Sequence, residues 1–377
     1  MPEFIPAFSL QRQTQQLRPV IAPAVERVLA SGRFIQGPEC AGLEQEVAGW
    51  LGQRGAAPGL AAVTCASGTD ALHLALRAVG IQAGDVVLTT AFSFFATAGA
   101  VLLAGARPEF VDVEPGTLNL APAALEQALL RPRTARIGAI VPVHLYGRMA
   151  DMAAISALAA GRRIPVVEDA AQAIGAAVGG RPAGAWGAAG CFSFYPTKNL
   201  GAMGEGGLVT TADAEVLEQL RLLRVHGSRR RYEHEILGWN ARMDELQAAI
   251  LRAKLPYLEG WNRRRVELAG LYDELLGPVK WVRRLAPATA GAHVYHQFVI
   301  RAPRREELRQ YLTERQIGTE VYYPIPLHQQ SALAQYATGA CPEAERAAAE
   351  VLALPMFPEL TEDEVVRMAA AVAAFYA

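Results

Sequence analysis

The sequence predicts an α/β protein in which a large domain with a mostly parallel central sheet is followed by a smaller C-terminal α+β domain. From about residue 60, short apolar runs alternate with longer stretches of helical periodicity, and after residue 243 a long helical stretch gives way to mixed material. Repeated βα units place strands in parallel and cover both faces of the sheet with helices. The chain has 377 residues, 51% of them hydrophobic, which is enough apolar material for two cores.

The elements follow in chain order. A helix is expected over residues 19–30, with Gly32 as its C-cap, and it can belong to either domain. Strands are expected at the short apolar runs 61–64, 86–88, 110–113, 140–143 and 165–167, with a helical segment at 71–76. Apolar residues at helical spacing predict a long helix over 244–258. We therefore place the large domain at residues 1–250 and the small domain at 251–377.

Charge and composition exclude several classes of partner. The chain carries 36 Lys+Arg against 37 Asp+Glu, so nothing suggests nucleic acid or an anionic membrane as a partner. No signal-peptide pattern opens the chain and no run approaches the roughly 18 apolar residues of a membrane span, so we expect a cytoplasmic protein. Cys40, Cys65, Cys191 and Cys341 form no C-x-x-C pair. No metal site is therefore expected, and a reducing compartment fits best. The spacing of the cysteines does not exclude a single disulfide.

The first site-like segment is 66–72, where a strand turns through a small residue and Gly68 into an apolar helix. In such sheets ligands bind outside the carboxyl ends of the strands. The free N–H groups and the positive end of the helix dipole favour an anion at this turn. An ordinary N-cap made by Ser67, Thr69 or Asp70 is the alternative.

Two further segments place ionisable groups at strand ends. Asp169 closes an apolar strand, where its carboxylate needs a partner such as a pyridinium nitrogen, unless it simply caps the next helix. Lys198 follows an aromatic strand and precedes four glycines within residues 201–207. A lysine is usually solvated, but one that points inward has a lowered pKa, which makes its neutral amine accessible for a Schiff base.

With these segments the chain resembles the DegT/DnrJ/EryC1/StrS family of sugar aminotransferases, which have the aspartate aminotransferase-like fold (fold type I) of enzymes that use pyridoxal phosphate (PLP). The similarity runs from roughly Gly32 to Leu360. Further matching segments are 32–38 (GRFIQGP), 143–147 (VHLYG), 226–227 (HG), 238–249 (GWNARMDELQAA) and 321–328 (VYYPIPLH). Each segment is short, but their order and spacing together are specific.

The resemblance implies PLP as cofactor and a role for each matching residue. Lys198 would form the Schiff base with PLP and, once released, move the proton during transamination. The other implied cofactor residues are Asp169 at the pyridine nitrogen, Gln172 beside O3′, Gly68, Thr69 and Ser193 at the phosphate, Phe94 over the ring, and Asn240 reaching the phosphate from the other subunit. Stacking by Phe94 would fix the ring plane, whereas Phe92 and Phe95 are equally well explained as core residues. The active sites would then be shared within a homodimer.

The implied reaction is transfer of an amino group from L-glutamate to a keto-sugar linked to dTDP, UDP or GDP, for amino-sugar biosynthesis leading to a surface polysaccharide or a glycoside. The amino group would go to a 3- or 4-keto carbon, and the segment 322–328 looks most like members that act at the 3-keto position. A dTDP- or UDP-linked sugar is expected. Tyr323 and His328 would face the nucleotide-sugar, and Arg229 its diphosphate. The alternatives are that His328 is simply a packed or solvated residue and that Arg229 belongs to a solvated run of charges with Arg230 and Arg231.

Three other functions are alternatives to this one. A PLP-dependent sugar dehydratase of this family carries histidine in place of the lysine, so Lys198 argues against it. A regulatory or sensory relative without catalysis stays possible on fold alone, and the retained Lys198, Asp169, Gln172 and Ser193 disfavour it. A nicotinamide enzyme needs G-x-G-x-x-G after its first strand, where this chain has Ser67-Gly68-Thr69.

Overall fold

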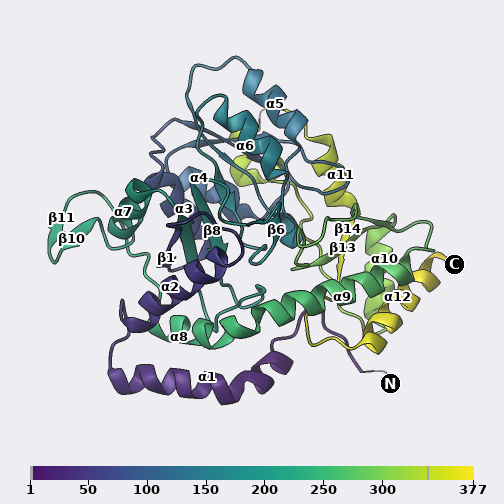
Figure 1. The fold of residues 1–377 in the computed structure, drawn as a ribbon. Coiled ribbons are helices and arrows are strands. Elements are labelled where there is room, and N and C mark those ends of the chain that lie inside the picture. The colour runs from purple at the N-terminus through teal and green to yellow at the C-terminus, as the bar shows by residue number, and fades with distance from the viewer. Residues whose placement is uncertain (1–2, 338) are drawn as a thin grey trace.

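The computed structural model describes residues 3–337 and 339–377. Its centre is a sheet flanked by helices (Figure 1). The strands lie in the orders β3-β2-β4 and β5-β8-β9-β1, and parallel bridges Ile140–Val166 and Val143–Asp169 join the two groups. The bounds are β1 Ala61–Cys65, β2 Val86–Thr90, β3 Arg107–Val111, β4 Ile137–Val141, β5 Val167–Asp169, β8 Ala189–Ser193 and β9 Gly207–Thr211. Only β9 pairs antiparallel with its neighbours among these strands, which confirms the mostly parallel sheet.

Helices cover both faces of this sheet and create a separate apolar core on each. One core contains Leu43, Leu51 and Ile140, and the other contains Leu74, Val87 and Val209. The helices are α2 Pro38–Gly52, α3 Gly68–Ala78, α4 Phe95–Leu103, α5 Pro122–Leu130, α6 Met152–Ala160, α7 Ala214–Leu223 and α8 Glu245–Lys254. Because both faces are buried, strands of the sheet are apolar along their length rather than alternating.

The C-terminal part has its own antiparallel sheet, in the order β12-β13-β14. The long helix α9 (Leu258–Leu276) runs from the central sheet into this part (Figure 1). The remaining elements are β12 Arg283–Arg284, β13 Phe298–Arg301, α10 Arg305–Glu314, α11 Pro342–Glu350, β14 Val351–Leu354 and α12 Glu362–Tyr376. Its core contains Leu268 and Tyr272 of α9. The boundary expected at residues 250/251 falls inside α8, and the division into domains stays a prediction.

The N-terminal helix α1 spans Gln11–Ser31 and ends at Gly32, whose left-handed φ of 63° confirms the expected C-cap. It begins eight residues earlier than expected, although proline is often found in the first turn of a helix. Pro19 and Pro23 instead lie inside the helix and are exposed, so carbonyl groups left without an N–H partner can bind water. The helix packs on α8 through Leu17, Ile21 and Ile250.

The helix expected over 244–258 is divided. A 3-10 turn at Leu255–Tyr257 separates α8 from α9, at the position of Pro256, which has no N–H to continue the pattern. Short pairs complete the fold: β6 Ala177–Val178 with β7 Arg181–Pro182, and β10 Ser228–Arg230 with β11 Glu233–His234. The 3-10 turns at Leu145–Gly147, Leu327–Gln329 and Ser331–Tyr336 are the remaining elements.

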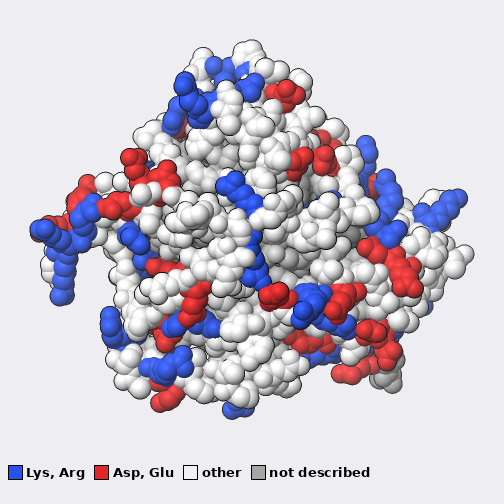
Figure 2. Space-filling model, viewed as in Figure 1, with Lys and Arg blue, Asp and Glu red and all other residues white. Residues whose placement is uncertain are grey.

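Basic and acidic side chains are interspersed on the face seen in Figure 2, and the projecting β10–β11 hairpin carries both signs. In the ranges that the structure describes, no helix combines the length and the apolar character needed to cross a membrane.

Candidate active site

The carboxyl ends of the parallel strands bring the predicted cofactor residues to one edge of the sheet. Strands β1 and β8 are both antiparallel to β9, and β5 is parallel to β8, so these three strands end at the same edge. Gly68 follows β1, Asp169 ends β5, and Ser193 ends β8. This edge is where ligands bind in sheets of this kind.

Asp169 is buried, with 5% of its surface exposed, and it is held by two hydrogen bonds. Thr97 Oγ1 donates to its Oδ2 (2.8 Å), and the N–H of Ala171 donates to its Oδ1 (3.2 Å). Burial raises the pKa of Asp169, while these hydrogen bonds and the positive charge of Lys198 oppose the rise. Ser93 Oγ in turn contacts Thr97 Oγ1 at 3.1 Å. The carboxylate keeps acceptor capacity for a further cationic partner.

Lys198 lies in the irregular segment after β8, where its N–H donates to the carbonyl of Tyr195 (2.8 Å). Burial of the amine lowers the pKa of Lys198 to about 8, and the negative charge of Asp169 acts in the opposite direction. The neutral amine is therefore accessible near neutral pH. A lysine of this kind can form a covalent bond to a carbonyl compound and can carry a proton.

A polar and aromatic group lies beside these residues. Gln172 Oε1 accepts a hydrogen bond from the N–H of Tyr146 (2.6 Å), and its Nε2 donates to the hydroxyl of Tyr323 (3.2 Å). The ring of Phe94 lies 6.0 Å from that of Tyr323, and Phe94 is 56% exposed. An aromatic ring this exposed beside a polar cluster leaves a face on which a flat ligand can stack.

The N-terminus of α3 lies against Ser193. A Cβ added to Gly68 would be 2.6 Å from the Cβ of Ser193, so only glycine fits there. Ser67 caps the helix by accepting from the N–H of Asp70 (3.1 Å). Capping by Ser67 leaves the N–H groups of Gly68 and Thr69 in the first turn, where helix geometry supplies no acceptor. Together with the hydroxyl of Ser193 these donors can hold a phosphate.

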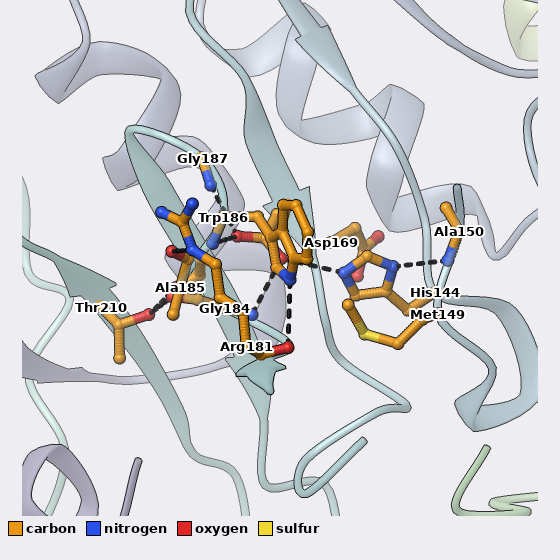
Figure 3. A network of polar contacts seen from close by, with 12 residues as sticks. His144, Met149, Ala150, Asp169, Arg181, Gly184, Ala185, Trp186, Gly187 and Thr210 are labelled. Carbon is orange, nitrogen blue, oxygen red and sulfur yellow. Dashed lines mark hydrogen bonds and ion pairs between the residues drawn. The ribbon is translucent and has the colours of Figure 1, made fainter. Parts of the chain in front are cut away.

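Glu168, the residue before Asp169, is fully buried and serves a different purpose. Its oxygens accept hydrogen bonds from the N–H groups of Gly184 (2.9 Å), Trp186 (2.6 Å) and Gly187 (2.8 Å) and from His144 Nε2 (3.0 Å). His144 Nδ1 accepts from the N–H of Ala150 (3.1 Å), as Figure 3 shows. The ring proton is therefore on Nε2 and points at Glu168. The backbone N–H of His144 also donates to the carbonyl of Asp169 (3.0 Å). The network therefore fixes the end of β5, from which Asp169 projects.

Three predicted residues lie away from this group within one chain. Asn240 is exposed and lines a surface cavity of about 350 Å³ with Gly204 and Glu205. Arg229 lies on the exposed hairpin, where it pairs with Glu218 and with Glu235 (2.9 Å). His328 is buried, and its Nε2 lies 3.0 Å from Glu345 Oε1. Their roles stay predictions.

Thr97 was not identified from the sequence, although the nearby Phe94 was. The sequence feature that could have indicated it is that Thr97 is the one hydroxyl residue in the apolar helix α4, one helical turn after Ser93. Within the described residues, no group of three or more His, Cys, Asp and Glu side chains is arranged to hold a metal ion. All four cysteines are buried free thiols.

Comparison with known proteins identifies one family. The model of the DegT/DnrJ/EryC1/StrS aminotransferase family matches residues 15–373. A UDP-N-acetyl-3-dehydro-alpha-D-glucosamine 3-aminotransferase of Acidithiobacillus ferrooxidans is 48% identical over 97% of this chain and 96% of its own length. A pleiotropic regulatory protein of Geobacillus stearothermophilus is 46% identical over 99% of this chain and 98% of its own length.

Solved structures agree. The crystal structure of Streptomyces venezuelae DesV in complex with a ketimine intermediate superposes with a TM-score of 0.94 at 41% identity, covering 100% of this chain and 99% of that one. NtdA of Bacillus subtilis with bound cofactor PMP superposes with a TM-score of 0.88 at 30% identity, covering 99% of this chain and 86% of that one. The similarity thus extends over both the central sheet and the C-terminal part.

Proposed function

We propose that this chain, which belongs to the DegT/DnrJ/EryC1/StrS aminotransferase family and is a PLP-dependent aminotransferase, transfers the amino group of L-glutamate to the 3-keto carbon of a dTDP- or UDP-linked sugar. The observation that carries the proposal is that Gly68, Asp169 and Ser193 meet at the carboxyl edge of the sheet, where the segment after β8 adds Lys198, whose pKa is lowered by burial. The name of the Acidithiobacillus relative, which contains a UDP-linked 3-keto sugar, supports the choice of position.

The residues present fit PLP. Gly68, Thr69 and Ser193 offer donors for its phosphate, and the absence of a side chain on Gly68 lets the N-terminus of α3 lie close to Ser193. We assign Asp169 to the pyridine nitrogen, Gln172 to the O3′ side and Phe94 to the ring face. Bound PLP supplies an electron sink that stabilises negative charge on the amine-bearing carbon. Asp169 keeps a proton at the ring nitrogen, because a carboxylate beside that atom favours its cationic form.

Lys198 has two assignments in this proposal. Its neutral amine attaches the cofactor, and its Nζ later takes the proton from the amine-bearing carbon of the substrate. A group that must both accept and release a proton works best with a pKa near the working pH. The pKa of Lys198, lowered to about 8 by burial, meets that requirement.

We also propose a homodimer with shared active sites, in which Asn240 reaches the phosphate of the partner's cofactor and Arg229 the diphosphate of the partner's sugar nucleotide. Both side chains are exposed in the single chain. Exposed apolar side chains next to Asn240 and on the hairpin side support coverage by a second copy: Phe34 (47%), Ile35 (44%), Met203 (43%) and Leu237 (86%). Tyr323 and His328 are assigned to the sugar-nucleotide side.

The test is an absorption spectrum of the purified protein with PLP, before and after L-glutamate, beside a Lys198→Ala variant. We expect the absorption of the lysine-bound cofactor in the wild type, its loss on addition of glutamate, and its absence in the variant. Amination is then followed with dTDP- and UDP-linked 3-keto sugars. A cofactor band that does not respond to glutamate would leave the cofactor in place but reopen the choice of amino donor and of reaction. No band at all would refute the PLP assignment and favour a regulatory protein.

A further inference from the structure

The segment that carries Lys198 has no regular secondary structure between the end of β8 and the start of β9. Side chains of α8 hold its far end: Lys254 Nζ donates to the carbonyl of Gly201 (2.6 Å), and Gln247 Oε1 accepts from the N–H of Met203 (2.9 Å). Neither contact is adjacent to Lys198. Closer to Lys198, the side chain of the next residue, Asn199, contacts residues outside the segment.

Asn199 is buried, and its amide is fully paired. Its Nδ2 donates to Asn262 Oδ1 (2.7 Å) and to the carbonyl of Val294 (3.1 Å), and its Oδ1 lies 3.2 Å from His296 Nδ1. Burial holds the pKa of His296 well below its usual range, so the ring is neutral. Because Asn199 presents an oxygen to it, the proton of His296 is on Nδ1 and donates to Asn199.

Asn262, on α9, connects this residue to a second active-site segment. Its Nδ2 donates to the carbonyl of Ile174 (2.9 Å), which follows Gln172 by two residues. A carbonyl can only accept, so Asn262 must present its amide nitrogen to Ile174 and its oxygen to Asn199. The neighbouring Gly175 has a φ of +94°, and a Cβ there would lie 2.5 Å from Asn262 Nδ2. The side chain of Asn262 thus fits closely between the two segments.

We propose that Asn262 is a positioning residue for the reaction: acting through Asn199, it fixes the segment of Lys198 relative to the segment of Gln172. This inference rests on the proposed roles of Lys198 and Gln172 at the cofactor. The donor and the acceptor of each hydrogen bond in this series are determined. The two amide groups therefore have one arrangement, and turning either of them round would break a hydrogen bond. A displacement of about 1 Å at a reacting group can lower a rate by about 100-fold, so a link of this kind affects the chemistry without touching it.

The test compares Asn262→Leu with Tyr272→Phe. Tyr272 lies on the same helix, is buried, and donates one hydrogen bond to a backbone carbonyl, that of Pro355 (2.9 Å), outside the Lys198 segment. The readouts are the rate at which the apoprotein attaches PLP, followed by absorption, and the melting temperature. We expect Asn262→Leu to slow attachment about 10- to 100-fold and Tyr272→Phe to leave the rate within about 2-fold, with both melting temperatures lowered.

A second variant tests the link from its other end. Asn199→Ser shortens the side chain and breaks the contact with Asn262, so it should slow attachment by a similar factor. The double variant Asn199→Ser/Asn262→Leu should be no slower than the slower single variant, because both remove one link. Additive effects, or an attachment rate in Asn262→Leu equal to that of Tyr272→Phe, would overturn the inference. Failure of the wild type to attach PLP would instead refute the proposed function.

Discussion

Thr97 gives the sharpest prediction, because its hydroxyl is the only side chain among the described residues that donates a hydrogen bond to the carboxylate of Asp169. Thr97→Val keeps a β-branched side chain and removes that donor. A hydrogen bond to a charged group contributes about 1.5–3 kcal/mol, so the ionised carboxylate loses that much stabilisation. At about 1.36 kcal/mol per tenfold change in proton concentration, the acidic limb of the pH–rate profile should move to about 10- to 100-fold lower proton concentration.

The assay is the half-reaction with L-glutamate, followed by absorption across the acidic pH range. Ser93→Ala is the matched control, since the Ser93 hydroxyl contacts Thr97 but not Asp169. Burial already raises the folded-state pKa of Asp169, so its ionised form costs stability above that pKa, and the cost fades as the pH falls through it. The extra instability of the Thr97→Val apoprotein should therefore be largest at neutral pH. An acidic limb unchanged from wild type, with stability equal to that of Ser93→Ala, would refute the reasoning.

Three other predictions concern the same edge of the sheet. The rate at which the apoprotein attaches PLP should rise with pH around a midpoint near 8, set by the neutral amine of Lys198; a midpoint near the ordinary 10.5 would contradict burial of the amine. Glu168→Leu should lower the free energy of unfolding in urea by at least about 3 kcal/mol, because three buried N–H groups and His144 lose their acceptor. A loss below about 1 kcal/mol would show that water replaces the carboxylate. Lys198→Ala and Asn240→Ala subunits, inactive or weak alone, should regain about a quarter of wild-type activity when unfolded and refolded together; no recovery would argue against shared sites.

The sequence predicted the parts of the fold that depend on local pattern. The runs at 86–88 and 140–143 overlap the strands Val86–Thr90 and Ile137–Val141, because a strand buried on both faces is marked by its own apolar residues. Gly32 could be identified as a C-cap because only its own φ is involved. Asp169 could be placed at the ligand-binding edge, since the edge follows from strand direction alone.

Other features depend on contacts between distant segments and left no local signal. Asn262 and Asn199 lie far apart in the chain, and neither stands in an unusual local pattern, yet a 2.7 Å hydrogen bond joins them next to Lys198. The predicted start of α1 was wrong for a related reason. Taken alone, Pro19 is typical of the first turn of a helix. In the structure the helix begins before Pro19, because Leu17 packs on Ile250 of α8 and stabilises the preceding turns.

The adjacent carboxylates of β5 show how burial and hydrogen bonding separate a structural from a functional acid. Successive side chains of a strand point to opposite faces, so Glu168 and Asp169 meet different surroundings, and the sequence Glu-Asp alone does not say which of them holds a cofactor. Every acceptor position of Glu168 is occupied by a neutral donor, which leaves no capacity for a ligand. Asp169 accepts two hydrogen bonds and keeps further lone pairs, so it alone of the pair can bind a cationic nitrogen.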